Sequence, residues 1–283
     1  MAVSALSAYA GRWFVVKIGG ELVANPKSVA ASVGRAVRRF LDERIKVALI
    51  HGAGPQATAL SQRLGLNPRT VAGRRVTDEA TLEVMKMTLA GQVSVDVAAA
   101  LRIAGVPTLA TTGVSAGLLD AVKRPPMLIP SEGPDPIDMG LVGDVSEINA
   151  PLFERIAGAG LVLTLASLAG DREGRVFNIN ADTVATRVAA ALHAAKLFLV
   201  SNVPGVLRDL NDPSSRIIRL NRSEARAQIE HGVIRAGMVP KVEESLALLD
   251  SGVDAIHIVG IEPPDSLLQE AEQPGSVGTV FEQ

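Results

Sequence analysis

Residues 178–182 (NINAD) bring two carboxamides and a carboxylate together directly before an alanine-rich run, residues 183–192, of helix-forming composition. Asn and Asp are favoured at helix starts because their side-chain oxygens accept the unpaired amide protons of the first turn. A polar turn that caps a helix is therefore a sufficient explanation of this segment taken alone. Three further polar, glycine-rich segments that also follow apolar runs favour a different interpretation, in which these side chains belong to one active site.

Two glycine loops follow the first two apolar runs of the chain. Gly19 and Gly20 come after residues 13–18 (WFVVKI), and residues 52–54 (GAG) come after residues 46–50 (KVALI) and His51. Exposed main-chain amides at the end of a strand, close to the start of a helix, bind anions such as phosphate or carboxylate. No GxxxxGK[ST] segment occurs, which excludes the common phosphate-binding P-loop.

Three cationic side chains could complete an anion site, and each has a simpler explanation. Lys17 interrupts an apolar run, so it is either functional or the solvent-reaching lysine of an edge strand. Arg75 could clamp a carboxylate with two hydrogen bonds, but it shares a polar stretch with Arg69 and Arg74, which favours a solvated arginine. Lys241 lies in the first turn of a predicted helix, where a cation opposes the helix dipole unless an anion is near.

The histidines and the absence of cysteine give little support for other kinds of catalytic or metal site. His51 precedes the second glycine loop and is a weak candidate for a catalytic base, and His193, His231 and His257 share no metal-ligand spacing. The chain contains no Cys, which excludes disulfides, thiolate catalysis and cysteine-based metal sites. We predict no metal site built from protein side chains.

Composition narrows the class of protein. Hydrophobic residues make up 47% of the 283 residues and aromatic residues 3%, so a large, aliphatic core is expected. Lys and Arg total 28 against 30 Asp and Glu, a net charge of −2, which argues against a nucleic-acid partner. Residues 1–10 lack the features of a secretory signal, and the apolar run 157–170 is shorter than the roughly 20 residues that span a bilayer. We expect a soluble, cytoplasmic protein with no membrane partner.

The elements that position these residues follow an alternating pattern. Strand, glycine loop and helix succeed one another twice at the start of the chain, which favours an α/β fold with ligands at the carboxyl ends of parallel strands. Residues 112–144 are rich in glycine and proline and predict a hairpin or flap. Strands are predicted at residues 13–18, 46–50, 106–111, 161–168, 196–200 and 255–259, with a last edge strand at 278–281. Helices are predicted at residues 28–44, 56–64, 79–103, 150–159, 183–192, 223–231 (capped by Ser223) and 237–249.

Six segments in a fixed order carry a resemblance. They are residues 17–20 (KIGG), 51–56 (HGAGPQ), 73–78 (GRRVTD), 178–182 (NINAD), 203–207 (VPGVL) and 237–241 (GMVPK). Each is weak alone, but their order resembles the amino acid kinase family over about residues 14–279. The resemblance implies a three-layer αβα sandwich around a central, mainly parallel open sheet. It implies one domain, residues 1–283, whose first lobe (13–175) binds an acyl-amino acid and whose second lobe (176–283) binds ATP.

Within that family the chain is similar to members that use ATP to phosphorylate the side-chain carboxylate of N-acetyl-L-glutamate, a step of arginine biosynthesis. The resemblance implies that Lys17 and Lys241 stabilise the transferring phosphoryl group and that Asp182 holds both lysines. Magnesium would be held mainly by ATP phosphates and water. The implied substrate-binding residues are Gly20, Gly52, Ala53, Gly54, Arg75, Asn178 and Asn180. The implied nucleotide-binding residues are Gly19, Ser201, Asn202, Val203, Gly205, Val206, Leu207 and Met238.

Three departures from the family pattern concern the substrate more than the reaction. Ala53 replaces a glycine, and its methyl group is expected to narrow the pocket and restrict the main chain. Residues 113–117 (GVSAG) stand where a Gly-Lys-Asp-Gly segment is common, so two charges are lost. Asn202 occupies a position that is commonly Asp.

Two other functions remain open. One is a kinase for a related substrate, such as the carrier-linked aminoadipate of lysine biosynthesis. The other is a non-catalytic, ligand-sensing relative, which the presence of Lys17, Asp182 and Lys241 together argues against. We also expect a homodimer.

Overall fold

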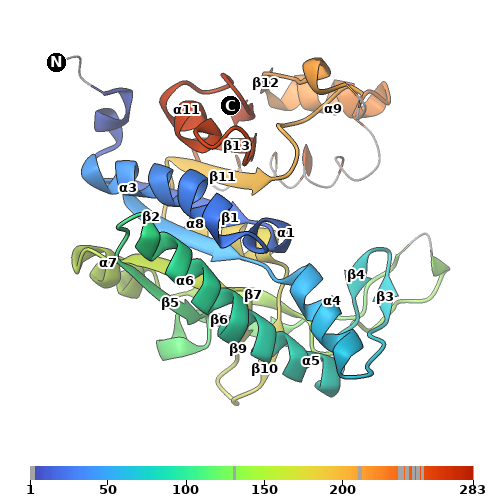
Figure 1. Ribbon diagram of the computed structural model, residues 1–283. Coiled ribbons are helices and arrows are strands. Elements are labelled where there is room, and N and C mark those ends of the chain that lie inside the picture. Colours follow the sequence, from blue (N-terminus) through green and yellow to red (C-terminus); the bar gives the residue numbers. More distant parts are fainter. Residues whose placement is uncertain are drawn as a thin grey trace.

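A computed structural model describes residues 4–129, 132–209, 212–234 and 252–282, together with Val239, Val242, Glu243, Leu246 and Leu249. Its centre is an eight-stranded sheet in the order β12-β14-β13-β11-β1-β2-β8-β5, drawn in Figure 1. Neighbouring strands are parallel except β13 and β14, which confirms the predicted mainly parallel sheet. The strands are β1 (Trp13–Ile18), β2 (Lys46–His51), β5 (Thr108–Thr112), β8 (Val162–Ala166), β11 (Lys196–Ser201), β12 (Arg219–Leu220), β13 (Ala255–Gly260) and β14 (Thr279–Glu282).

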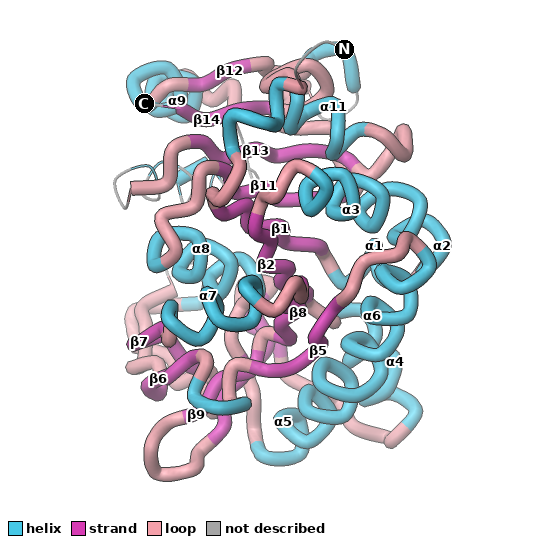
Figure 2. The backbone as a smooth tube through the Cα atoms, turned by 90° about the vertical axis from the view of Figure 1, so that its left-hand side faces the viewer, coloured by secondary structure: helices cyan, strands magenta, loops and turns pink. Residues whose placement is uncertain are grey.

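Two layers cover this sheet, as Figure 2 shows from the side. One face carries α1 (Gly20–Val23), α2 (Pro26–Val29), α3 (Arg35–Asp42), α4 (Gly54–Arg63), α5 (Glu79–Met85), α6 (Ser94–Ile103) and α11 (Ser266–Glu272). The other carries α7 (Ala150–Gly158), α8 (Ala181–Ala191) and a four-stranded sheet of β10 (Val176–Asn178), β9 (Leu168–Gly170), β6 (Leu119–Lys123) and β7 (Gly143–Ile148). Helix α9 (Arg222–Glu230) follows β12. The predicted three-layer αβα sandwich is confirmed.

The alternation of side chains along β1 decides where Lys17 points. Trp13 and Val15 pack in the core on the α8 side of the sheet, whereas Phe14, Val16 and Ile18 pack in the core under α3 and α6. Successive strand residues face opposite sides, so Lys17 faces α8. Because β1 lies between β2 and β11, the interpretation of Lys17 as an edge-strand lysine is wrong.

Some predicted elements differ in detail. The strand predicted at 278–281 forms as β14, but it is not an edge strand, because β12 pairs on its outer side. Helix α9 is capped by Asn221, whose side chain accepts from the amide of Glu224, and not by Ser223. The helix predicted at 28–44 begins with α2 and continues through a π-helical turn, η2 (Ala30–Gly34), into α3. Strands β9 and β10 were not predicted.

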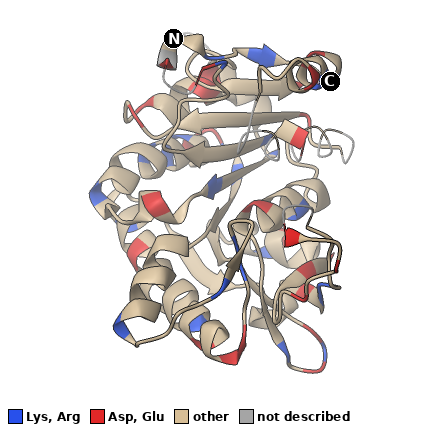
Figure 3. Cartoon of the chain, turned by 90° about the vertical axis from the view of Figure 1, so that its right-hand side faces the viewer, with Lys and Arg blue, Asp and Glu red and all other residues tan. Residues whose placement is uncertain are grey.

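The long helix predicted at 79–103 is also confirmed and consists of α5, a π-helical turn η3 (Lys86–Val93) and α6. This stretch, Glu79–Ile103, is long and apolar enough to cross a membrane by length and composition alone. Half of its apolar window is buried (50%), and α6 packs on β5 and β8, so packing in the core accounts for its composition. Charged residues of both signs are interspersed over the side of the molecule drawn in Figure 3.

Strands β6 and β7 pair antiparallel and form the hairpin predicted for residues 112–144. A second, short hairpin consists of β3 (Thr70–Val71) and β4 (Arg74–Arg75). Thr77, which follows it, binds the β6–β7 hairpin: its amide donates to Met139 O at 2.9 Å. Thr77 O accepts from the amide of Leu141 at 2.6 Å. Gly140 is required here, since a Cβ would lie 2.3 Å from Thr77 O and the φ angle is +74°.

A buried polar cluster is formed by Lys196 of β11, His257 of β13 and Glu270 of α11. His257 Nδ1 donates to Glu270 Oε1 at 2.8 Å, and the amides of Gly275 and Gly278 donate to the same carboxylate, both at 2.7 Å. Burial lowers the pKa of His257 and by itself raises that of Glu270, but the hydrogen bonds to Glu270 lower its pKa below the usual range. Lys196 donates to a main-chain carbonyl, and burial lowers its pKa to about 8.

We expect Glu270→Gln to lower the free energy of unfolding by about 3 kcal/mol, because a buried network loses its charged acceptor. Both folded-state pKa values lie below those of the unfolded chain, so the unfolded state binds more protons and stability falls as the pH falls below 6.5 and then 4.5. Urea titrations between pH 4 and 8 measure both effects. Arg172→Gln, which removes only exposed ion pairs, is the control. A wild-type midpoint for Glu270→Gln would contradict the prediction.

Candidate active site

The carboxyl ends of β1, β2 and β8 open into a cleft with a volume of about 700 Å³. Its walls come from both glycine loops, the β3–β4 hairpin, the β6–β7 flap and the start of α8. The cleft brings together these predicted site residues: Lys17, Gly19, Gly20, Gly52, Ala53, Gly54, Arg75, Asn178 and Asn180. Segments far apart in the sequence thus converge where a parallel sheet presents its loops.

Lys17 and Asp182 form an ion pair, with 2.9 Å between Nζ and Oδ1. The two side chains are 14% and 22% exposed, so the pair is shielded but still reached by solvent. Asp182 lies in the first turn of α8, where a carboxylate interacts favourably with the helix dipole. The geometry agrees with a carboxylate that orients a cationic lysine.

The two glycine loops touch each other. A Cβ built on Gly20 would lie 2.9 Å from Gly54 N and 3.0 Å from Ala53 Cα, so only glycine allows this approach. A Cβ on Gly52 would lie 3.9 Å from Gly20 N. The main-chain amides of both loops therefore gather at one place beside Lys17, at the N-terminus of α4, which favours anions.

Ala53 differs from the expectation. Its φ is −148°, on the side of φ open to every residue type and not the positive range that requires glycine, and its side chain is 2% exposed within the core. The expected restriction of the main chain is therefore absent, and the methyl group takes little room from the cleft.

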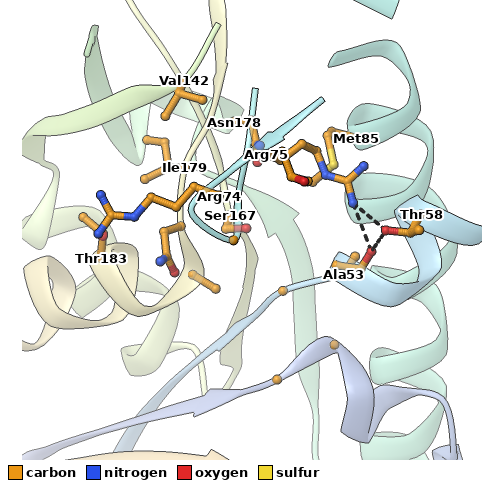
Figure 4. A pocket seen from close by; sticks show the side chains of 18 of the residues that line it. Ala53, Thr58, Arg74, Arg75, Met85, Val142, Ser167, Asn178, Ile179 and Thr183 are labelled. Carbon is orange, nitrogen blue, oxygen red and sulfur yellow. Dashed lines mark hydrogen bonds between the residues drawn. The ribbon is translucent and has the colours of Figure 1, made fainter. Parts of the chain in front are cut away.

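Arg75 lies on β4 and reaches over to α4. Figure 4 shows its guanidinium directed at Thr58: Nη2 donates to Thr58 Oγ1 at 2.7 Å and to Gly54 O at 3.3 Å. Nη1 is buried and has no hydrogen-bond partner among the described residues. Burial lowers the pKa of Arg75. Arg75 lines the cleft, and a guanidinium turned toward it with Nη1 unpaired among the described residues is suited to bind a carboxylate. This favours the functional interpretation over a solvated arginine.

The two asparagines have different surroundings. Asn178 Nδ2 donates to Thr77 Oγ1 at 3.2 Å, which links β10 to the segment that follows β4. Asn180 caps α8, since its side chain accepts from the amide of Asp182 at 2.8 Å. The helix-capping interpretation of residues 178–182 is thus correct, and it is compatible with a site, because the cap orients Asp182.

Sequence reasoning missed several residues of the cleft. Arg124, on the flap, binds Asp144 through Nε at 3.0 and 3.1 Å to the two carboxylate oxygens. Arg74 points the opposite way from Arg75 (Figure 4) and donates to the sulfur of Met127 at 3.7 Å. The other missed lining residues include Thr58, Met85, Met139, Val142, Ser167 and Thr183. A signal existed only for Ser167, a polar residue near the end of the strand predicted at 161–168, and for Thr58, one helical turn after Gly54.

The segment predicted to bind the nucleotide follows β11, the neighbour of β1 on the other side from β2. Ser201 Oγ and the Val203 main chain hydrogen bond to each other, and Asn202 is exposed. Val206 and Leu207 are buried, and a Cβ on Gly205 would lie 2.5 Å from Thr279 Oγ1. Met238 and Lys241 lie outside the described residues, so their roles, like this segment's role in nucleotide binding, remain predictions.

His51 does not belong to the cleft. It is fully buried, its Nε2 lies 3.1 Å from Ser94 Oγ, and burial lowers its pKa to about 4. A neutral, enclosed imidazole has no access to a substrate, so we assign it to packing of β2 against α6. Among the described residues no group of three or more His, Asp or Glu side chains is placed to hold a metal.

Comparison with known proteins agrees with this geometry. Residues 12–260 match the model of the amino acid kinase family. The chain is 49% identical to the acetylglutamate kinase of Sorangium cellulosum over 94% of this chain and 93% of that one. It is 47% identical to the acetylglutamate kinase of Anaeromyxobacter dehalogenans over 95% of this chain and 98% of that one.

Among solved structures, an N-acetylglutamate synthase from Neisseria gonorrhoeae, complexed with coenzyme A and N-acetyl-glutamate, superimposes with a TM-score of 0.81 at 26% identity. The match covers 99% of this chain but only 61% of the synthase. The parallel sheet with its two touching glycine loops, the Lys17–Asp182 pair and the family match over most of the sequence lead to one conclusion: this chain belongs to the amino acid kinase family.

Proposed function

We propose that the chain transfers the γ-phosphoryl group of ATP to the side-chain carboxylate of N-acetyl-L-glutamate, as a step of arginine biosynthesis. The observation that carries the proposal is the shielded Lys17–Asp182 pair beside the gathered amides of the two glycine loops. The similarity to acetylglutamate kinases over more than nine-tenths of the chain supports this substrate over a carrier-linked aminoadipate or a ligand-sensing role.

In this mechanism a carboxylate oxygen attacks the γ-phosphorus, and the bond to the bridging oxygen breaks, so that ADP leaves with the electron pair. Both partners are anions, and catalysis therefore consists of alignment and positive charge. Lys17 stabilises the transferring group, Asp182 orients Lys17, and the amides of Gly20 and Gly54 hold the phosphoryl oxygens. Arg75 binds the other carboxylate of the substrate through its unpartnered Nη1.

We propose further that Lys241 stabilises the same group from the nucleotide side and that residues 201–207 and Met238 bind ATP. Magnesium bound with ATP would neutralise phosphate charge, and its ligands would be phosphate oxygens and water. The site has cationic and amide donors suited to phosphate, and Asp182 is already paired with Lys17, which supports a metal held by the nucleotide and not by the protein.

The proposal is tested by incubating the protein with ATP, Mg²⁺ and N-acetylglutamate in the presence of hydroxylamine, which traps acyl phosphates as hydroxamates. We expect hydroxamate and ADP in equal amounts, with neither formed when N-acetylglutamate is omitted. ADP without hydroxamate would point to ATP hydrolysis and would overturn the proposal. Free glutamate and N-acetylaspartate are matched controls for the acyl group and the chain length.

The flap leads to a prediction about substrate selectivity. Residues 113–117 lack the two charges common in the family, and the flap residues that line the cleft are Arg124, Met127, Met139 and Val142. We therefore expect a less restrictive cover over the acyl group. We predict that the flap closes when N-acetylglutamate binds, and that more than one N-acyl amino acid is turned over. Hydrogen exchange of residues 112–144 should slow on adding N-acetylglutamate, with β13 as an unchanged reference. Unchanged exchange would exclude closure, and strict use of N-acetylglutamate would exclude the relaxed selectivity.

We also propose a homodimer, and a cytoplasmic location remains a prediction. Among the described residues, α6 exposes Val95 (64%) and Ile103 (71%), and the adjoining edge strand β5 exposes Leu109 (41%). Exposed apolar side chains on an edge strand and on the helix packed beside it favour self-association about a twofold axis. Light scattering should give twice the chain mass of 29.5 kDa, and the mass of a single chain would contradict the proposal.

A further inference from the structure

The side chain of Gln56 ties the two glycine loops together. Gln56 lies in the first turn of α4, and its Nε2 donates to Gly20 O at 2.6 Å. A carbonyl oxygen only accepts hydrogen bonds, so the orientation of the carboxamide is determined: Nε2 faces Gly20 O. This contact is the side-chain hydrogen bond that joins the loop after β1 to the loop after β2.

The contact leaves little freedom between the loops. A Cβ built on Gly20 would lie 3.0 Å from Gln56 Oε1 and 2.9 Å from Gly54 N. The carboxamide of Gln56 and the amide of Gly54 therefore occupy the space that a side chain at position 20 would need. Gln56 Oε1 is buried and has no hydrogen-bond partner among the described residues. Leaving a buried acceptor unpaired is unfavourable, by about 1–3 kcal/mol. The hydrogen bond from Nε2 to Gly20 O is therefore the interaction that holds the carboxamide of Gln56 in this position.

The second loop is also held from the opposite side, since Arg75 Nη2 donates to Gly54 O at 3.3 Å. Gly54 is therefore fixed between the residue that reaches Gly20 and the residue that is suited to bind the substrate carboxylate. We expect a change in Gln56 to alter the distance between the amides of Gly20 and Gly54. Arg75 keeps its shorter hydrogen bond to Thr58, and Lys17 keeps its ion pair with Asp182.

We infer that Gln56 is a positioning residue for phosphoryl transfer: it sets the spacing of the Gly20 and Gly54 amides that hold the phosphoryl oxygens. The inference rests on the proposed function. Donors aimed at a transition state act only when they are placed in advance, and a displacement of about 1 Å can lower the rate about 100-fold. The hydrogen bond of Gln56 reaches Gly20, whereas those of Arg75 reach Gly54 O and Thr58, so we expect the effect to fall on kcat more than on substrate affinity.

The test compares Gln56→Met, which keeps the length but cannot donate, with Gln62→Met, an exposed position on the same helix. We expect Gln56→Met to lower kcat by about 30- to 100-fold with KM for N-acetylglutamate changed less than threefold and an unchanged melting temperature. Gln62→Met should equal the wild type. A kcat within twofold of wild type, or a loss that follows a lowered melting temperature, would overturn the inference.

Gln56→Glu supplies an independent readout. The introduced carboxylate repels Gly20 O when ionised but donates to it when protonated, and burial favours the protonated form. The ratio of its kcat to that of the wild type should therefore rise as the pH is lowered from 8 to 5.5. A flat ratio would contradict the positioning role. Absence of turnover by the wild type would overturn the proposed function and this inference together, whereas wild-type turnover in Gln56→Met overturns this inference alone.

Discussion

Lys17→Met is expected to lower kcat by about 1,000-fold while changing the KM for N-acetylglutamate only a few-fold. The charge of Lys17 matters most when negative charge is redistributed over the transferring group, which is a property of the transition state. In the variant, Asp182 also loses its cationic partner at 2.9 Å and opposes the approach of two anions.

Steady-state kinetics with both substrates varied measures the effect. Lys46→Met is the matched control. Lys46 is the first residue of β2, at the end of the β1–β2 pair away from the cleft, and it forms an ion pair with Glu154. A kcat within tenfold of the wild type would remove Lys17 from the mechanism. Lys241→Met is expected to behave like Lys17→Met, since the resemblance assigns the two lysines to the same phosphoryl group.

The substitution Arg75→Lys is expected to weaken binding of N-acetylglutamate by about 1–3 kcal/mol, which corresponds to a factor of about 5 to 150 in Kd. Lysine keeps the charge but cannot hold Thr58 and Gly54 O with one nitrogen while it offers a second to a carboxylate. The change in kcat should be smaller than the change in KM, because this carboxylate does not react.

Titration calorimetry with N-acetylglutamate gives the affinity directly. Arg69→Lys is the control, since Arg69 is exposed in the same stretch and does not line the cleft. Equal affinity of Arg75→Lys and wild type would exclude Arg75 from the substrate site, and its buried guanidinium would then serve only to join β4 to α4.

Local sequence patterns correctly predicted those strands, loops and helix caps that depend on main-chain conformation. The β-branched run before Gly19 forms β1, the run before His51 forms β2, and both glycine loops lie where a parallel sheet places them. Asn180 caps α8 as its composition predicts. These features depend on a few neighbouring residues, so the sequence contains them.

The outcome at Lys17 and Arg75 depended on packing. The sequence left two equal interpretations of Lys17 and favoured a solvated arginine for Arg75. The choice followed from the position of β1 inside the sheet and from Thr58 on α4. The same holds for β14, whose outer neighbour β12 comes from a segment with no strong strand signal.

The sequence by itself indicated an α/β fold and two glycine loops after parallel strands. It also contained six segments, with Lys17, Arg75 and Lys241 among them, in an order that resembles the amino acid kinase family. Only the tertiary structure decided that Lys17 pairs with Asp182, that Gln56 hydrogen bonds to Gly20, and that Nη1 of Arg75 has no partner in the part of the chain that the structure describes. The physical reason is that hydrophobic periodicity reports which face of each element is buried. The partner across that face is selected by strand order and by the packing free energy of the whole chain, neither of which any short segment contains.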